Sequence, residues 1–278
     1  MQMKLVSVNV GLPREVTFHG MKVVTGICKE PVPGRVRVRT LNLDGDRQAD
    51  LTVHGGEDKA VYCYPLSHYQ YWKKELADRG QGRDLPMGSF GENFTVDFAT
   101  HFGGPDSREN DSRASASREK DSRGNDSRGN DSLQNDSRGH AARANESCKN
   151  GALPEDFVQI GDRFSVGTAE VVVTQPRLPC YKLGVKFQSD DMVKRFLVSR
   201  RMGFYFAVRR EGEVGAGDEL RLIAREPVAV PVSEIPRLYI AKAYSDGDVN
   251  IVRRALQLEA LPESWKEYFR ERLEGGRS

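Results

Sequence analysis

Residues 156–183 read DFVQIGDRFSVGTAEVVVTQPRLPCYKL, and this stretch decides the fold. Two short runs rich in Val and Phe are separated by a glycine, a pattern typical of two β-strands joined by a tight turn; they are Arg163–Val166 and Ala169–Thr174. Pro176 and Pro179 then restrict the backbone, so the sequence predicts a rigid loop, Thr174–Leu183, that carries Cys180. We expect a β-rich domain in which a strand leads directly to a cysteine.

Short alternating runs, punctuated by Gly and Pro, make up most of the chain as far as residue 226. Strands of this length and spacing favour a sandwich or a barrel, which leaves few strand edges open. The other predicted strands are Lys4–Val10, Arg35–Leu41, Ala60–Tyr64, Asn93–Val96, Gly203–Arg209 and Glu219–Ile223. Apolar residues at helical spacing predict two helices in this region, Ser67–Asp78 and Ser189–Ser199.

Residues 104–150 differ in composition from their surroundings. They repeat pentads such as DSRGN and contain only seven apolar residues in 47, too few to offset the entropy of ordering the backbone. The sequence predicts a disordered insertion in the loop of a single folded domain. The nine Lys and Arg of this Arg/Ser-rich segment are balanced by nine Asp and Glu, which argues against nucleic acid as a partner.

The chain changes character after Pro227 and Pro231. Three amphipathic stretches follow, at roughly 233–244, 247–259 and 262–274, and the last has Trp265, Phe269 and Leu273 four residues apart. We therefore predict two domains, a β domain over 1–228 and a three-helix domain over 229–278. The default interpretation of the three-helix domain is a module for packing or for docking a partner, without a catalytic role.

Overall composition excludes several classes of protein. Lys and Arg number 42 and Asp and Glu 40, and a formal charge of +2 argues against binding to bulk nucleic acid or an acidic membrane by charge alone. No apolar run approaches the roughly 20 residues that span a bilayer. The alternating N-terminus reads as a strand rather than a secretory signal, which predicts a cytoplasmic protein with reduced cysteines.

Cys180 is the strongest candidate for chemistry. Arg177 and Lys182 lie close to it in sequence, and nearby cations favour the thiolate that acts as nucleophile or metal ligand. An inert cysteine is the alternative. Cys28 and Cys63 lie in runs that look buried, where cysteine behaves as a small hydrophobic residue.

Two glycine-containing segments are weaker candidates. Within Asp44–Lys59, the pair Gly55 and Gly56 could turn backbone N–H groups toward an anion, with His54 and Lys59 adding donors. A hairpin turn with solvated charges explains this segment almost as well. Gly88–Thr95 offers a carboxylate and an amide, but entry into a strand is its default interpretation.

Taken together, these pieces resemble one family. GDRQADLTVHGGEDKAVYCYPLSHYQYW, GSFGENFTV, the stretch quoted first and GFYFAVRREGEVGAGDEL follow in the order of a MOSC domain of the YiiM type, over about residues 3–226. Segment 229–275 resembles the small three-helix domain that follows MOSC in the same proteins. The resemblance implies a mainly β, MOSC-type β-barrel with flanking helices, interrupted by the disordered insertion at 104–150.

The resemblance also implies a molybdenum cofactor, a molybdopterin, and assigns residues to it by position. Cys180 would ligate the metal through sulfur, as suits a soft thiolate. The pterin phosphate would be held by Lys59, Arg177 and the Gly55 and Gly56 turn. His54 and Asn93 would lie near the open side of the metal, and Lys29 matches a recurring K-x-P-V without a derived role. At the family level, pyridoxal phosphate binding is a further association, with no residue assigned.

The implied reaction is reductive removal of oxygen from an N-hydroxylated compound, as in detoxification of N-hydroxylaminopurines. His54 is the expected proton donor. No flavin, haem or iron–sulfur motif is recognised in the sequence, so a separate flavin reductase is the expected electron donor. Two alternatives stay open: a persulfide sulfur carrier on Cys180 without metal, and a nonenzymatic RNA- or protein-binding barrel that uses the Arg/Ser-rich loop.

Overall fold

The computed structural model describes residues 2–50, 55–99 and 152–275. The predicted insertion at 104–150 and the candidate His54 lie outside the described residues. Within the described ranges, no helix is long and apolar enough to cross a membrane.

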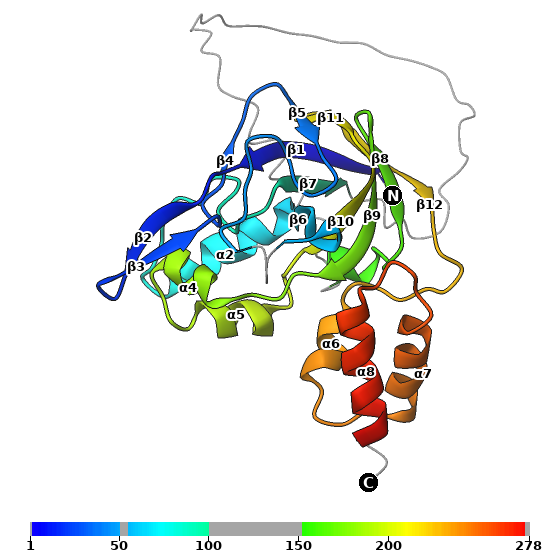
Figure 1. Cartoon of the computed structure of the whole chain (residues 1–278). Coiled ribbons are helices and arrows are strands. Elements are labelled where there is room, and N and C mark those ends of the chain that lie inside the picture. The colour runs from blue at the N-terminus through cyan, green and yellow to red at the C-terminus, as the bar shows by residue number, and fades with distance from the viewer. Residues whose placement is uncertain (1, 51–54, 100–151, 276–278) are drawn as a thin grey trace, which may run out of the picture.

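A closed β-barrel forms the centre of the molecule (Figure 1). β12 pairs with β1 through Met3 and Leu220, which joins the two ends of the sheet and closes the ring. The β6–β7 pair is parallel and its neighbours in the ring are antiparallel. The predicted mainly β fold, with a barrel and flanking helices, is confirmed. In order around the barrel, the strands are β1 (Gln2–Val10), β7 (Phe94–Ala99), β6 (Val61–Pro65), β10 (Phe204–Arg210), β9 (Ala169–Pro176), β8 (Arg163–Val166) and β12 (Glu219–Ala224).

Short strands outside this ring were mostly missed by the sequence analysis. β4 (Glu30–Pro31) extends the pairing of β1, and β5 (Arg35–Val38) pairs with β11 (Gly212–Gly215). β2 (Arg14–Phe18) and β3 (Met21–Thr25) form a hairpin that projects from the barrel (Figure 1). Its turn residues, His19 and Gly20, both have positive φ, as a type I′ hairpin turn requires.

Two apolar cores stabilise the domain. The first fills the barrel, where alternate residues of each strand point inward. The second is aromatic and lies under three helices, where the Trp72 and Phe196 rings stack with centroids 5.5 Å apart. Cys28 and Cys63 are buried, as predicted. The helices that cover this second core are α2 (Leu66–Asp78), α4 (Tyr181–Phe187) and α5 (Met192–Ser199).

Helices α2 and α5 confirm the two predicted helices, although α5 begins three residues later than expected. Helix α4 was not predicted, and the placement of Tyr181–Leu183 in a loop is wrong. The loop is shorter because Leu183 and Phe187 of α4 pack into the aromatic core. Val185 of the same helix is also buried.

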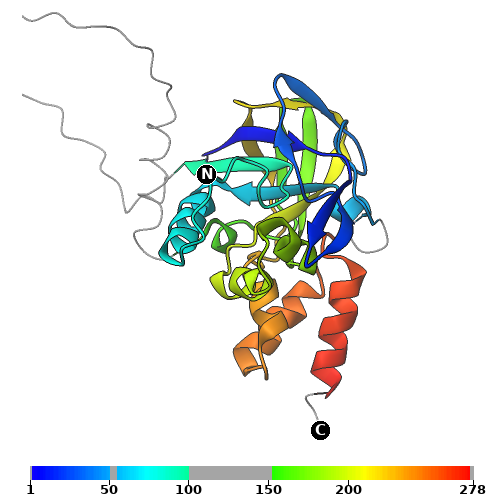
Figure 2. The same ribbon diagram turned by 90° about the vertical axis from the view of Figure 1, so that its left-hand side faces the viewer.

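The last three helices are α6 (Glu234–Ile240), α7 (Asp246–Ala255) and α8 (Glu263–Gly275). Both views place them together on one side of the barrel (Figures 1 and 2). A capping box of Ser245 and Asp248 starts α7. The core of these helices is continuous with that of the barrel, and Trp265 Nε1 donates a 2.9 Å hydrogen bond to Gln175 Oε1 on β9. The predicted boundary at 228/229 stays a prediction.

Candidate functional site

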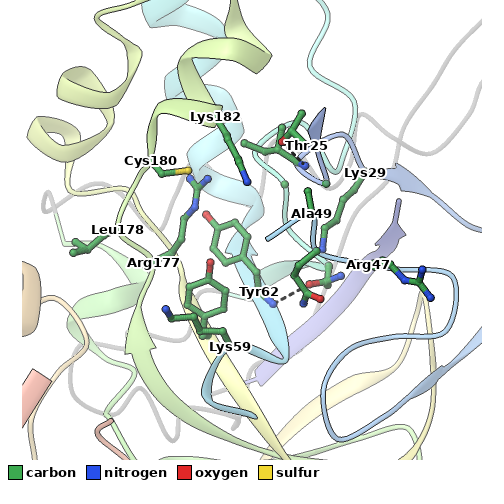
Figure 3. A pocket seen from close by; sticks show the side chains of 16 residues that line it. Thr25, Lys29, Arg47, Ala49, Lys59, Tyr62, Arg177, Leu178, Cys180 and Lys182 are labelled. Atoms are coloured by element: carbon green, nitrogen blue, oxygen red, sulfur yellow. Dashed lines mark hydrogen bonds between the residues drawn. The ribbon is translucent and has the colours of Figure 1, made fainter. Parts of the chain in front are cut away.

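A pocket opens beside the loop that joins β9 to α4. The space between its walls, counted out to the open mouth, is about 640 Å³. Its walls come from the segment after β3, the loop around Gln48, strands β6 and β10, and the cysteine loop (Figure 3). Five predicted site residues line the pocket, namely Lys29, Lys59, Asn93, Arg177 and Cys180. Lys182, a cation close to Cys180 in sequence, lines it as well.

Cys180 is the residue immediately before α4. Strand β9 ends at Pro176, and the Cys180 backbone carbonyl accepts a 2.9 Å hydrogen bond from Leu183 N in the first turn of the helix. The side chain is half-buried, and its sulfur lines the pocket rather than the apolar core. The barrel and the helix therefore fix a thiol that a ligand can still reach.

Arg177 is buried and has no carboxylate partner within residues 2–50, 55–99 and 152–275. It is only 6 % exposed, and its guanidinium carbon lies 5.1 Å from the centre of the Tyr62 ring and 5.2 Å from that of Phe196. Burial alone lowers the pKa of Arg177, but Tyr62, Tyr205 and Cys180, which can carry negative charge, raise it above its ordinary value. The guanidinium stays charged, yet Nη1 has no hydrogen-bond partner among the described residues.

A buried cation with an unsatisfied donor is costly unless something pairs with it. Figure 3 shows the Arg177 guanidinium and the Lys182 ammonium directed toward a common space beside the Cys180 sulfur. The nearby Tyr62 hydroxyl donates a 2.7 Å hydrogen bond to the Met202 carbonyl. The pocket lining contains five Lys and Arg side chains and no carboxylate among the described residues: Lys29, Arg47, Lys59, Arg177 and Lys182. This donor set fits an anionic group such as a phosphate.

Lys29 and Asn93 line the pocket but are held by Asp46 behind its wall. Lys29 Nζ lies 2.7 Å from Asp46 Oδ2, and Asn93 Nδ2 donates to the same oxygen over 2.9 Å. Asn93 Oδ1 accepts from the Tyr62 backbone N–H at 3.0 Å. Burial lowers the pKa of Lys29, and Asp46 opposes that shift. Lys29 and Asn93 therefore have a visible structural role; their predicted cofactor contacts stay predictions.

Lys59 ends the short 3-10 helix η1 (Glu57–Lys59) and lines the pocket. Burial lowers the pKa of Lys59, and Asp58 raises it less. The Asp58 carbonyl accepts a 2.7 Å hydrogen bond from Thr174 Oγ1, which fastens η1 to β9 and so places Lys59.

The predicted anion turn is not among the described pocket walls. Gly56 has φ of 99° and its carbonyl accepts from Lys59 N, but neither Gly55 nor Gly56 lines the pocket. A Cβ on Gly56 would meet nothing within 4 Å. The predicted contact of this turn with a phosphate stays a prediction.

Glu92 has a structural role, as the strand-entry interpretation of Gly88–Thr95 expected. The carboxylate is fully buried and accepts hydrogen bonds from Gly88 N at 2.8 Å, Phe90 N at 3.1 Å and Thr95 Oγ1 at 2.9 Å, and from the Tyr69 hydroxyl. These bonds fix the turn that carries Gly91, where a Cβ would approach Ile27 Cγ1 to 2.8 Å. The glycine lets this turn form a wall of the pocket.

Several pocket residues were missed by sequence reasoning. Arg47 and Gln48 lie in the quoted GDRQAD motif, so a signal was present but unassigned. Tyr62 and Tyr205 read only as alternating strand residues, and no local pattern distinguishes a pocket-facing tyrosine from a core one. Thr25 ends β3, which was not predicted, and Gly26 and Ile27 follow that strand.

The comparisons with known proteins agree with this arrangement. A profile described as the MOSC domain matches residues 50–108 and 127–221. The chain belongs to the MOSC family. A second profile, described as the YiiM-like 3-alpha helix domain, matches residues 249–276 and covers α8 and most of α7. The MOSC and three-helix resemblance recognised in the sequence is thus confirmed.

Relatives of this MOSC protein match over nearly all of its length. It is 32 % identical to YflK of Bacillus subtilis, described as uncharacterized, covering 95 % of this chain and 92 % of that protein. It is 26 % identical to YiiM of Escherichia coli over 91 % of this chain and 86 % of the relative. The crystal structure of YiiM from Geobacillus stearothermophilus matches with a TM-score of 0.63 and 28 % identity, covering 98 % and 99 % of the two chains. Membership is compatible with a cofactor-binding role of the sulfurase or reductase kind.

Proposed function

We propose that this MOSC protein binds a molybdenum cofactor in the pocket beside Cys180 and reduces N-hydroxylated compounds. The observation that carries the proposal is Arg177, a buried cation that shares a pocket with a reachable thiol and whose Nη1 has no partner in the part of the chain that the structure describes. Few ligands need both an anion site and a soft sulfur ligand. A phosphorylated pterin that holds molybdenum needs both.

Cys180 is the residue proposed to bind the metal. Among the described residues, no group of three or more His, Cys, Asp or Glu side chains could hold a metal ion. A metal bound by Cys180 therefore needs other ligands, and the sulfur atoms of a pterin dithiolene would supply them. The cofactor, once bound, supplies the redox chemistry of the site.

The cations of the pocket are proposed to hold the phosphate end of the cofactor. Arg177 is fixed by its backbone, since its N–H donates to the Gly203 carbonyl at 3.2 Å, and by the Tyr62 and Phe196 rings. Lys59 and Lys182 reach the same pocket from η1 and α4. Because the guanidinium is positioned before the ligand arrives, little conformational entropy is lost on binding.

The proposed reaction converts an N-hydroxylated compound into the parent nitrogen compound and water. It consumes two electrons and two protons, and the N–O bond breaks. A separate flavin reductase is the proposed electron source, and His54 stays the proposed proton donor. A cytoplasmic location would suit both a reduced thiol and such a partner.

A reductase-type role is supported by one further relative. The chain is 23 % identical to a Gibberella moniliformis protein named reductase, over 91 % of this chain and 35 % of that protein. The name belongs to that larger protein, so the substrate and the electron donor of the present chain rest on the experiment below.

The test is elemental and pterin analysis of protein purified from a host that synthesises the cofactor. We expect about one molybdenum and one pterin per chain, and N-hydroxylated substrates should be reduced with a chemical electron donor. Molybdenum-free protein with cyanide-labile sulfur on Cys180 would favour the persulfide carrier instead. Deletion of 104–150 should leave reduction intact; loss of RNA or protein binding on that deletion, without any bound metal, would favour the nonenzymatic alternative.

A further inference from the structure

A second hollow adjoins the cofactor pocket at its mouth. It shares Ala49 and Lys182 with that pocket, and its other walls include Lys22 and Val24 of the β2–β3 hairpin and Tyr181 of α4. We call this hollow the outer pocket and the pocket beside Cys180 the inner pocket. Because the two spaces have residues in common, a molecule in the outer pocket lies next to whatever the inner pocket holds.

The hairpin wall of the outer pocket is tied to the opposite wall. His19 Nε2 at the hairpin turn lies 2.9 Å from Asp190 Oδ1, just after α4. Gln188 Nε2, at the end of α4, donates to the Thr17 carbonyl over 3.2 Å. Figure 1 shows the hairpin beside α4. These two solvent-exposed contacts hold the hairpin against the opposite wall of the outer pocket, which is a shallow hollow open to solvent.

Two apolar side chains in the outer pocket face solvent. Tyr181 is 61 % exposed and Val24 is 57 % exposed. Tyr181 makes no hydrogen bond or ring contact with the part of the chain that the structure describes, although it directly follows Cys180. An aromatic ring that is held by a helix but has no internal partner offers a face on which a planar ligand can stack.

Charged residues around the outer pocket further restrict which ligands can bind there. The outer pocket is lined by two lysines and one carboxylate, Lys22, Lys182 and Asp50. Lys22 is well exposed and pairs with Glu15 at 2.8 Å, while Lys182 is largely buried at the boundary with the inner pocket. The neighbouring inner pocket adds Arg177 and Lys59. This positive field disfavours cationic ligands and favours neutral or anionic ones.

We propose that the outer pocket is the substrate subsite and that Tyr181 determines specificity. The subsite binds the flat aromatic or heteroaromatic body of a neutral or anionic N-hydroxylated substrate, stacked on the Tyr181 ring and against Val24. The N–O group then points toward Cys180. This inference rests on the proposed reductase function and adds a residue that selects aromatic over aliphatic substrates.

The test compares two substrates with the same reacting group, benzhydroxamic acid and acetohydroxamic acid, in protein loaded with cofactor. Loss of one stacking contact is worth about 0.5–1.5 kcal/mol, so Tyr181→Ala should raise the KM for benzhydroxamic acid roughly 2- to 12-fold. The KM for acetohydroxamic acid and the kcat values for both substrates should stay as in the wild type. Tyr181→Phe should restore the wild-type KM, because the ring is what matters.

Val198→Ala is the matched control, since Val198 is exposed on α5 outside both pockets. A direct binding measurement separates this inference from the proposed function. NMR titration with benzamide should show weaker binding to Tyr181→Ala than to Tyr181→Phe even if no variant contains molybdenum or turns over substrate. Equal KM changes for both substrates, or unchanged benzamide binding in Tyr181→Ala, would overturn the subsite. Absence of molybdenum and of turnover in wild type would overturn the reductase proposal alone.

Discussion

The Arg177 guanidinium carbon lies 5.1 Å from the centre of the Tyr62 ring, and no carboxylate completes the pair among the described residues. Aromatic faces offset only part of the cost of removing a guanidinium from water. A protein that keeps such a cation gives up stability at this position, and ligand binding is the physical reason to keep it.

The first prediction separates stability from binding at this residue. Arg177→Met should abolish cofactor retention while the free energy of unfolding of the empty protein stays equal or rises by about 1 kcal/mol, because an unpaired buried charge disappears. Urea unfolding and metal analysis measure the two effects. Arg201→Met is the control, since the Arg201 guanidinium also lies over a ring, that of Tyr71, outside the pocket. A large stability loss with normal metal content would show that Arg177 is structural.

The second prediction concerns the proposed metal ligand. Cys180→Ser should lose molybdenum and activity but unfold within about 0.5 kcal/mol of wild type, because the side chain is half-buried and not part of the apolar core. Cys63→Ala is the matched control. That residue is fully buried on β6, so the variant should lose about 1 kcal/mol yet keep its metal. Full metal content in Cys180→Ser contradicts the ligand assignment.

The third prediction follows from Lys29 and Asp46. Lys29→Met leaves the Asp46 carboxylate buried without its cation and should cost about 3–5 kcal/mol of unfolding free energy. Adding Asp46→Asn to that variant should recover part of the loss. Lys22→Met, which breaks the exposed pair with Glu15, should cost under about 1 kcal/mol. Equal losses of unfolding free energy in Lys29→Met and Lys22→Met would show that the buried pair contributes no more to stability than the exposed one.

The fourth prediction is a pH dependence that originates at Glu92. Burial raises the pKa of Glu92 above its ordinary value of 4.5, and hydrogen bonds oppose the shift only in part. In the window above 4.5 the folded protein therefore holds a proton that the unfolded chain has released, and stability falls as pH rises through the folded-state pKa. The difference in unfolding free energy, wild type minus Glu92→Gln, should decrease from pH 4 to pH 7. Glu259→Gln, at an exposed position, controls for loss of a surface charge, and an increase with pH would refute the sign.

The fifth prediction tests the attachment of the three helices. Trp265→Phe keeps an aromatic ring but removes the donor to Gln175 Oε1, leaving a buried acceptor unsatisfied at a cost of about 1–3 kcal/mol. Tyr268→Phe removes an exposed hydrogen bond to the Tyr239 carbonyl and a partly buried one from Arg272 Nη1. It should cost less than Trp265→Phe, because neither of these partners is fully buried. Denaturant unfolding of both variants measures the difference. Indistinguishable variants would show that Trp265 contributes by packing alone.

The sequence predicted those elements whose signal is local. The Val-rich run of β9 and the Trp265, Phe269 and Leu273 spacing of α8 are visible within about ten residues, and both elements formed as expected. The β2–β3 hairpin escaped because its strands are exposed along most of both faces, so no alternation marks them. Helix α4 escaped because it is short and follows two prolines.

The candidate site shows the same division. Cys180, Arg177 and Lys59 were identified from the composition of their own segments, and all three line one pocket. The pairing of Lys29 with Asp46, and the entry of Tyr62 and Tyr205 into the pocket wall, depend on contacts between distant strands. Such contacts follow from the closed barrel and leave no mark on a single sequence window.

Barrel closure between β1 and β12 has a consequence for biosynthesis. One edge of β1 cannot pair until β12 has been synthesised, because the partner of Met3 is Leu220. Most of the polypeptide therefore leaves the ribosome while that edge is still unpaired. An open edge of this kind invites pairing with other nascent chains. Expression yield should therefore depend on chaperone supply during synthesis of the residues between β1 and β12, more than on the thermodynamics of the finished molecule.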